Sequence, residues 1–163
     1  MILITVGTQL PFDRLVRMID QIAPLLREPV FAQIGRANYR PTNIEFAPTV
    51  APDIFAAKVK AARLIVAHAG IGTVFTAQKH GKPLVLVPRE TRFGEHRNDH
   101  QLATCRQLLD RPGVYVATDQ PTLAALLSAP DLRPAQTEVV PEHRQQLLGN
   151  LQKYLAAVRP RRR

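Results

Sequence analysis

The chain has 163 residues, of which 45% are apolar and 21% are charged. That length fits one domain, or the part of a larger enzyme that a single core can serve, and the composition excludes wholesale disorder. Lysine and arginine number 22 against 13 acidic residues, and the net charge of +9 predicts an anionic partner such as a nucleotide, a phosphorylated lipid, a membrane surface or a nucleic acid.

Short apolar runs alternate with longer amphipathic stretches along the chain. An unbroken apolar run predicts a buried strand, and apolar residues that recur every three or four positions predict a helix. On this basis we expect strands at 2–6, 29–34, 44–47, 64–67, 83–87 and 113–117. The expected helices lie at 12–22, 53–62, 74–80, 98–109 and 121–128.

Strands that are apolar on both faces and alternate with helices are typical of a parallel sheet covered by helices on each side. We therefore predict an α/β fold with a Rossmann-like parallel sheet. Its domain spans residues 1–129, a Pro-rich connector follows at 130–141, and residues 142–163 form a C-terminal helix and basic tail. The apolar stripe of that helix, at Leu147 and Leu151 among others, must pack on this domain or on a partner.

In parallel sheets of this kind, ligands bind where the carboxyl ends of the strands meet helix N-termini. Gly7 and Thr8 follow the first expected strand, and a glycine there lets the backbone approach an anion. The sequence HAGIGT at 68–73 follows another strand and has two glycines and a threonine where outward N–H groups can bind phosphate. It lacks the third glycine of a dinucleotide fingerprint and the lysine of a P-loop. At both places a purely structural turn is the alternative.

The segment PRETRFGEHRNDHQ at 88–101 gathers arginine, histidine and acidic side chains after the fifth expected strand. So many polar residues are unusual in a simple solvated connector. His96 and His100 share one face if the segment is helical, and with Asp99 or Glu95 they could hold a metal, although no HExxH pattern supports this. Binding a sugar nucleotide through histidine, glutamine and arginine side chains needs the same residue types and is the better interpretation.

The cysteine content and the hydropathy pattern predict a cytoplasmic protein. Cys105 is the only cysteine, which excludes an internal disulfide and fits a reducing compartment, and we expect it to be a buried structural thiol. Apolar runs such as 84–87 are far shorter than the roughly 20 residues needed to cross a bilayer. The start of the chain has no basic segment typical of a signal peptide.

Four motifs together resemble a known family. MILITVGT followed by FDRLV, then AHAGIGT, HGKPLVLVPR and GEHRNDHQLAT occur in this order within about residues 1–125. They resemble the C-terminal domain of glycosyltransferase family 28 and, more narrowly, the small exopolysaccharide-biosynthesis subunits of the PssE type. A similar subunit serves the two-component N-acetylglucosaminyltransferase of eukaryotic N-glycosylation.

The resemblance implies the C-terminal half of an inverting GT-B glycosyltransferase, a hexosyltransferase divided between two chains. This chain would bind the UDP-sugar donor, and a membrane-associated subunit would supply the other half and the lipid-linked saccharide acceptor. The chain would then lie at the inner face of the membrane through its partner. The PssE grouping implies transfer of glucuronate from UDP-glucuronate. No cofactor, metal or nucleic acid is expected, and the catalytic base is expected on the partner chain.

The same resemblance implies which residues bind the donor. The residues around its diphosphate would be Gly7, Thr8, His68, Gly70, Gly72 and Thr73. The pair next to the donor sugar would be His100 and Gln101. The arginines that would suit a carboxylate-bearing sugar are Arg89, Arg92 and Arg97. Many members have a glutamate that holds the ribose where this chain has Thr76, which can make only weaker contacts.

Two other functions fit the composition. A module that binds nucleotide or nucleic acid without catalysis would also carry a charge of +9, although 3 tyrosines, 6 phenylalanines and no tryptophan offer little base-stacking surface. A homodimer could instead complete its own cleft and act as a self-sufficient glycosyltransferase. Preference for uridine donors argues against the first alternative, and activity without a partner supports the second.

Overall fold

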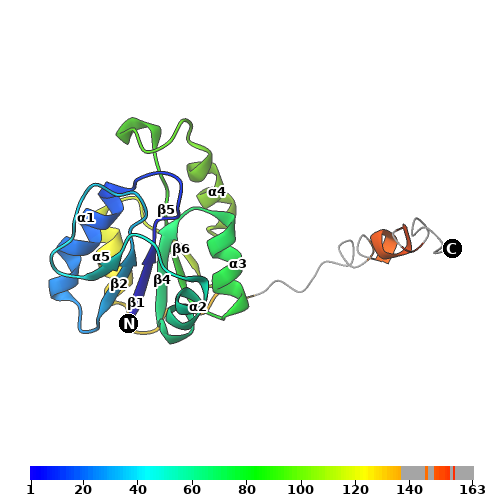
Figure 1. Cartoon of the computed structure of the whole chain (residues 1–163), viewed down its shortest axis with the longest axis horizontal. Coiled ribbons are helices and arrows are strands. Elements are labelled where there is room, and N and C mark those ends of the chain that lie inside the picture. Colours follow the sequence, from blue (N-terminus) through cyan, green and yellow to red (C-terminus); the bar gives the residue numbers. More distant parts are fainter. Residues whose placement is uncertain (137–145, 147–148, 155, 157–163) are drawn as a thin grey trace.

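A six-stranded parallel sheet forms the centre of the domain (Figure 1). The computed structural model describes residues 1–136, 146, 149–154 and 156. The strands are β1 (Ile2–Thr5), β2 (Val30–Gln33), β3 (Glu45–Ala47), β4 (Leu64–His68), β5 (Leu84–Val87) and β6 (Val114–Val116). All pairings are parallel, and the order across the sheet is β3-β2-β1-β4-β5-β6.

Helices cover both faces of the sheet, so the predicted α/β fold is confirmed. The helices are α1 (Asp13–Ile22), α2 (Pro52–Ala61), α3 (Ile71–Lys79), α4 (His100–Leu108) and α5 (Gln120–Ser128). One apolar core joins α1 and α5 to one face of the sheet, and a second joins α2, α3 and α4 to the other (Figure 1). Short 3₁₀ turns occupy Ala23–Leu25 and Thr91–Phe93.

The apolar runs of the strands follow from burial on both faces. In β1, Ile2 and Ile4 belong to the core beneath α1 and α5, whereas Leu3 belongs to the core beneath α2, α3 and α4. Successive side chains of a strand point to opposite faces, so a strand between two helical layers needs apolar residues at every position. Polar Thr5 appears only at the carboxyl end of the strand.

Two helices begin two or three residues from their predicted starts, whereas the other three begin within one residue of theirs. Helix α3 starts at Ile71 instead of residue 74, so Gly72 lies in its first turn. Helix α4 starts at His100 instead of residue 98, because Asp99 is its N-cap and turns its carboxylate to Thr91. His96 therefore lies in the preceding loop and does not share a helix face with His100, although their ring centroids are 4.4 Å apart.

The described part of the expected connector packs on the domain. Ala135 is 2% exposed and its backbone N–H donates to the carbonyl of Lys82, and the Arg133 N–H donates to the Tyr115 hydroxyl. The rest of that connector and the predicted contacts of Leu147, Leu148 and Leu155 lie outside the described residues. Residues 149–154 are helical, and Leu151 is 47% exposed.

The single cysteine is buried, as predicted. Cys105 is 3% exposed on α4, and burial raises the pKa of its thiol to about 11. A thiol in this state is not a nucleophile at neutral pH. None of the helices in the described part of the chain is long and apolar enough to cross a bilayer.

Substitution of Gly113 tests the packing of residues 134–135. Gly113 has a φ of +78°, and a Cβ there would lie 2.2 Å from backbone atoms of Pro134 and Ala135. Gly81 is the matched control because its φ is +57° and its surroundings are open. We expect Gly81→Ala to cost about 1–2 kcal/mol for the left-handed backbone alone. Gly113→Ala should cost a further ~1–3 kcal/mol for the steric conflict. Urea denaturation measures both, and equal losses would contradict the packing described.

Candidate donor-binding site

Two neighbouring pockets open at the carboxyl ends of β1 and β4. The larger, of about 380 Å³, extends towards α2 and is lined by Val50, Pro52 and Phe55 among others; we call it the α2 pocket. The smaller, of about 320 Å³, lies beside the loop before α4, and we call it the loop pocket. Both pockets are lined by Gly7, Thr8 and His68. These three residues therefore mark the junction of the two pockets.

His68 lies at the junction between two glycines. A Cβ at Gly7 would lie 2.8 Å from the His68 Cε1 atom, and a Cβ at Gly70 would lie 2.4 Å from Nε2. Gly7 also has a φ of +79°, which favours glycine. The two glycines thus let the backbone on either side approach the imidazole ring closely. This close approach explains why both positions hold glycine.

The His68 imidazole is neutral at physiological pH. Burial, followed by the nearby positive charge of Arg89, lowers the pKa of His68 to about 4. Within the described residues, Nδ1 is buried and has no hydrogen-bond partner. A neutral imidazole carries a proton on one nitrogen only, so Nε2 can donate a hydrogen bond to a ligand when Nδ1 is unprotonated.

The N-terminus of α3 borders the same junction. Gly70 is its N-cap residue, and no side chain caps the first turn. A Cβ added at Gly72 would meet no atom within 4 Å, so this turn faces open space in the α2 pocket. Uncapped N–H groups and the positive end of the helix dipole favour an anion at such a position.

The charged side chain that lines these pockets is positive. Of the described residues that line them, none is an aspartate or glutamate, and Arg89 is the only arginine or lysine. The site therefore suits an anionic ligand. None of the described carboxylates lines the junction as a candidate general base.

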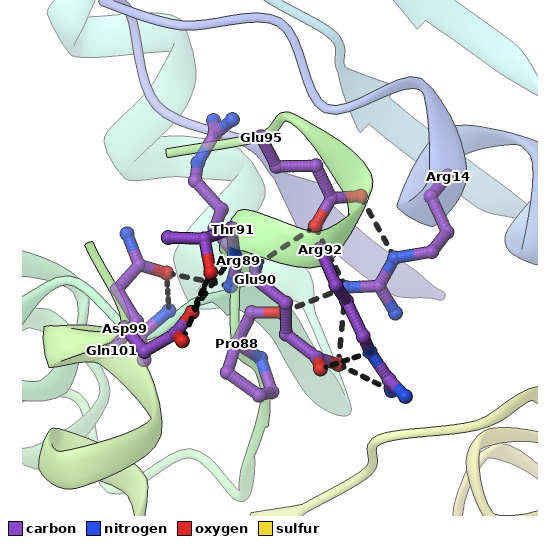
Figure 2. A network of polar contacts seen from close by, with 10 residues as sticks. Arg14, Pro88, Arg89, Glu90, Thr91, Arg92, Glu95, Asp99 and Gln101 are labelled. Carbon is purple, nitrogen blue, oxygen red and sulfur yellow. Dashed lines mark hydrogen bonds and ion pairs between the residues drawn. The ribbon is translucent and has the colours of Figure 1, made fainter. Parts of the chain in front are cut away.

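The acidic side chains of the 88–101 segment take part in a network of polar contacts with the loop and with Arg14 (Figure 2). None of them lines either pocket. Glu95 accepts two hydrogen bonds from Arg14, at 2.7 and 2.9 Å. Glu90 forms an ion pair with Arg92 at 2.6 Å. Asp99 accepts hydrogen bonds from both the backbone and the hydroxyl of Thr91.

Arg89 and Gln101 join three segments of the site. Arg89 is 3% exposed, and its guanidinium donates to the backbone carbonyls of Val6, Leu10 and Pro11. Gln101 is 4% exposed, and its Oε1 accepts from the backbone N–H groups of Ala69 at 3.2 Å and Arg89 at 3.0 Å. Both residues still line the loop pocket. Their side chains thus fix the walls of that pocket.

The structure brings most of the predicted site residues together. The α2 pocket is lined by Gly7, Thr8, His68, Gly70, Gly72 and Thr73. The loop pocket includes Arg89 and Gln101. His100 and Arg97 are exposed and line neither pocket, and Arg92 pairs with Glu90. Thr76 lines the α2 pocket and donates its hydroxyl proton to the carbonyl of Gly72.

Sequence reasoning missed a buried polar pair at the α2 pocket. The Thr5 hydroxyl donates to Oε1 of Gln33 at 2.7 Å, and both side chains line the pocket. Thr5 and Gln33 are the last residues of the adjacent strands β1 and β2. A polar residue that ends an otherwise apolar strand was the available signal, because strand ends form the ligand-binding edge of a parallel sheet.

Comparison with known proteins identifies the family. Residues 1–123 match the glycosyltransferase family 28 C-terminal domain. The chain belongs to this family. No curated protein matches its sequence.

Solved structures, glycosyltransferases among them, share the fold. The calicheamicin glycosyltransferase CalG4 has a TM-score of 0.62 at 20% identity, over 98% of this chain and 44% of that one. MurG of Acinetobacter baumannii has a TM-score of 0.55 at 20% identity, over 93% and 49%. ALG13 has a TM-score of 0.59 at 15% identity, over 90% and 94%. This chain thus spans less than half the length of CalG4 and MurG and nearly all of ALG13. The predicted fold, that of one half of a GT-B glycosyltransferase, is confirmed.

The low pKa of His68 predicts a pH-dependent stability. In the unfolded chain a histidine takes up its proton near pH 6.5, whereas folded His68 resists protonation until about pH 4. The free energy of unfolding should therefore fall by at most about 3 kcal/mol as the pH is lowered through this window. We expect His68→Asn to remove this slope in urea denaturation at several pH values. His80→Asn, outside both pockets, should retain it, and an unchanged slope in His68→Asn would contradict the assignment.

Proposed function

We propose that this chain binds a UDP-sugar as the donor half of a glycosyltransferase. The observation that carries the proposal is the junction of two pockets, lined by no described aspartate or glutamate, at the uncapped N-terminus of α3 in a family 28 domain. A nucleoside diphosphate sugar has three parts in a row, with the anionic part in the middle. The two pockets and their junction offer a matching order of surfaces.

The α2 pocket suits the nucleoside. Val50, Pro52 and Phe55 give it an apolar wall for a base, and the Thr5–Gln33 pair supplies polar atoms. Thr76 would lie near the ribose, and its oxygen retains capacity to accept a hydrogen bond while donating to Gly72. An apolar cleft with a few placed polar groups is the usual composition of a small-molecule site.

The diphosphate would lie at the junction and the sugar in the loop pocket. The α3 N-terminus and neutral His68 can both donate hydrogen bonds to phosphate oxygens there. In the loop pocket, the two backbone donors that hold Oε1 of Gln101 leave its amide N–H groups for sugar oxygens. His96 lines the same pocket, and His100 lies against His96.

Glucuronate is the sugar that we propose, in line with the PssE-like motifs. A carboxylate-bearing sugar needs an arginine that is not already paired, and bidentate pairing with arginine is the strongest arrangement. Arg97 is exposed and forms no hydrogen bond or ion pair in the described part of the chain. Arg89 and Arg92 are engaged by backbone carbonyls and by Glu90. Arg97 lines neither pocket but directly follows His96, which lines the loop pocket, so it is the arginine left for this role at the rim.

The transfer step would use a base from a partner subunit. That base takes the proton from an acceptor hydroxyl while the hydroxyl oxygen attacks the anomeric carbon from the face opposite UDP. The bond from that carbon to the diphosphate oxygen breaks, and UDP leaves with the bonding electrons. In this chain the α3 N-terminus stabilises the leaving diphosphate. The absence of a carboxylate among the described lining residues supports a base on the other half.

We also propose the setting of the reaction. The partner would be a membrane-associated subunit that binds a lipid-linked saccharide, and the pair would act at the inner face of the membrane in exopolysaccharide biosynthesis. The chain spans less than half the length of CalG4 and MurG. The proposed boundaries remain a donor domain at 1–129, a connector at 130–141 and a terminal segment at 142–163.

Filling the α2 pocket from Gly72 tests the proposal. A valine side chain at Gly72 meets no protein atom within 4 Å of its Cβ position, so the fold should tolerate it. It would occupy the space in front of the first turn of α3, and we expect UDP affinity to fall at least tenfold by calorimetry. Ala125→Val, at an exposed position of α5, is the matched control. Unchanged UDP binding by folded Gly72→Val would contradict the site.

A further inference from the structure

We propose that Arg89 supplies positive charge to the diphosphate junction from behind the first loop, without contacting the donor, while it holds that loop in place. The inference rests on the proposed function and adds to it a residue that acts through the backbone. Arg89 would thus be a positioning and electrostatic residue instead of a ligand for a sugar carboxylate.

The hydrogen bonds of Arg89 explain why it does not reach for a ligand. Nη2 donates to the carbonyls of Val6 and Leu10, both at 2.8 Å, and Nη1 donates to the carbonyl of Pro11. The guanidinium also lies 4.5 Å from the centroid of the Phe12 ring. With 3% of the residue exposed, the group is held on several sides.

These carbonyls flank the segment that both pockets share. Gly7 and Thr8 lie between Val6 and Leu10, and they line the α2 pocket and the loop pocket alike. One planar guanidinium that binds carbonyls on both sides of this segment fixes its path. Lysine offers a single ammonium group without the rigid fork, so it cannot reproduce this arrangement.

No carboxylate is hydrogen-bonded to the Arg89 guanidinium in the described part of the chain. Glu95 attracts it electrostatically, but the Glu95 oxygens accept from Arg14, and Glu90 pairs with Arg92. Backbone carbonyls solvate a guanidinium without cancelling its charge. Burial lowers the pKa of Arg89, yet arginine remains protonated at neutral pH because its ordinary pKa lies far above neutrality.

The charge of Arg89 acts at the junction. It is one of the two main causes that lower the pKa of His68, whose ring lines both pockets. A field that reaches this imidazole also reaches an anion beside it, and low-dielectric walls strengthen such a field. The dipole of α3 has the same sign at the same place. An anionic ligand should gain from both sources, and an uncharged nucleoside from neither.

The test separates charge from structure by comparing UDP with uridine. Calorimetry gives the affinity of UDP, and competition against UDP gives that of uridine, for the full chain and three variants. Arg89→Met removes both the charge and the fork, Arg89→Lys keeps the charge, and Arg106→Met removes an exposed charge on α4. We expect the ratio of UDP to uridine affinity to fall at least tenfold in Arg89→Met alone. In Arg89→Lys both ligands should weaken together as the loop loosens.

Two results would overturn the inference. An equal loss of UDP and uridine affinity in Arg89→Met would show that Arg89 has a purely structural role. A ratio of UDP to uridine affinity that falls as far in Arg89→Lys as in Arg89→Met would show that its charge plays no part. If wild-type chain binds no UDP, the proposed function fails instead.

Should the Arg89 variants not fold, ³¹P NMR of UDP bound to the wild-type chain provides the test. We expect the terminal phosphate of bound UDP to titrate at lower pH than that of free UDP. An unchanged or higher pKa of this phosphate would overturn the inference.

Discussion

Strands β1 and β4 lie side by side at the centre of the sheet, and the chain leaves them in opposite directions. Helix α1, which follows β1, packs on one face, whereas α3, which follows β4, packs on the other. The two exits leave a gap at the carboxyl ends of these strands that no helix covers. Gly7, Gly70 and His68 border this gap, so both pockets depend on the reversal of strand order.

Most polar side chains near the gap stabilise its walls. Arg14, which belongs to α1, binds Glu95 and the carbonyl of Pro88 and so ties the loop before α4 to the opposite layer (Figure 2). Gln101 joins that loop to the segment after β4. A site built from fixed backbone N–H groups loses little entropy when a ligand binds, since the donors are already in place. This arrangement suits the donor binding that we propose.

The fold could be predicted from sequence because its signal is local. Each central strand is buried on both faces and is therefore an unbroken apolar run, and glycines or prolines mark its ends. The start of α3 was missed because Ile71 is 57% exposed and Gly72 is a poor helix former, so neither residue extends the apolar stripe. The two helix starts that differ most from the prediction, those of α3 and α4, both lie at the site.

The roles of the 88–101 residues could not be predicted, because their partners are distant in sequence. Arg89 binds carbonyls of Val6 and Leu10, about eighty positions earlier, and Glu95 binds Arg14. Composition shows that the segment is polar, but only these long-range contacts decide which side chains face a pocket. The Thr5–Gln33 pair was missed for the same reason, since its members meet only when β1 and β2 pair.

The central claim is that this chain holds a uridine donor, and calorimetric titration of the purified chain tests it most directly. UDP, UDP-glucuronate and UDP-N-acetylglucosamine would be titrated in parallel into the chain and into a co-expressed pair with its partner subunit. The account predicts that the chain alone binds UDP and prefers UDP-glucuronate to UDP-N-acetylglucosamine. Absence of binding to all three ligands, in both the chain and the pair, would contradict it.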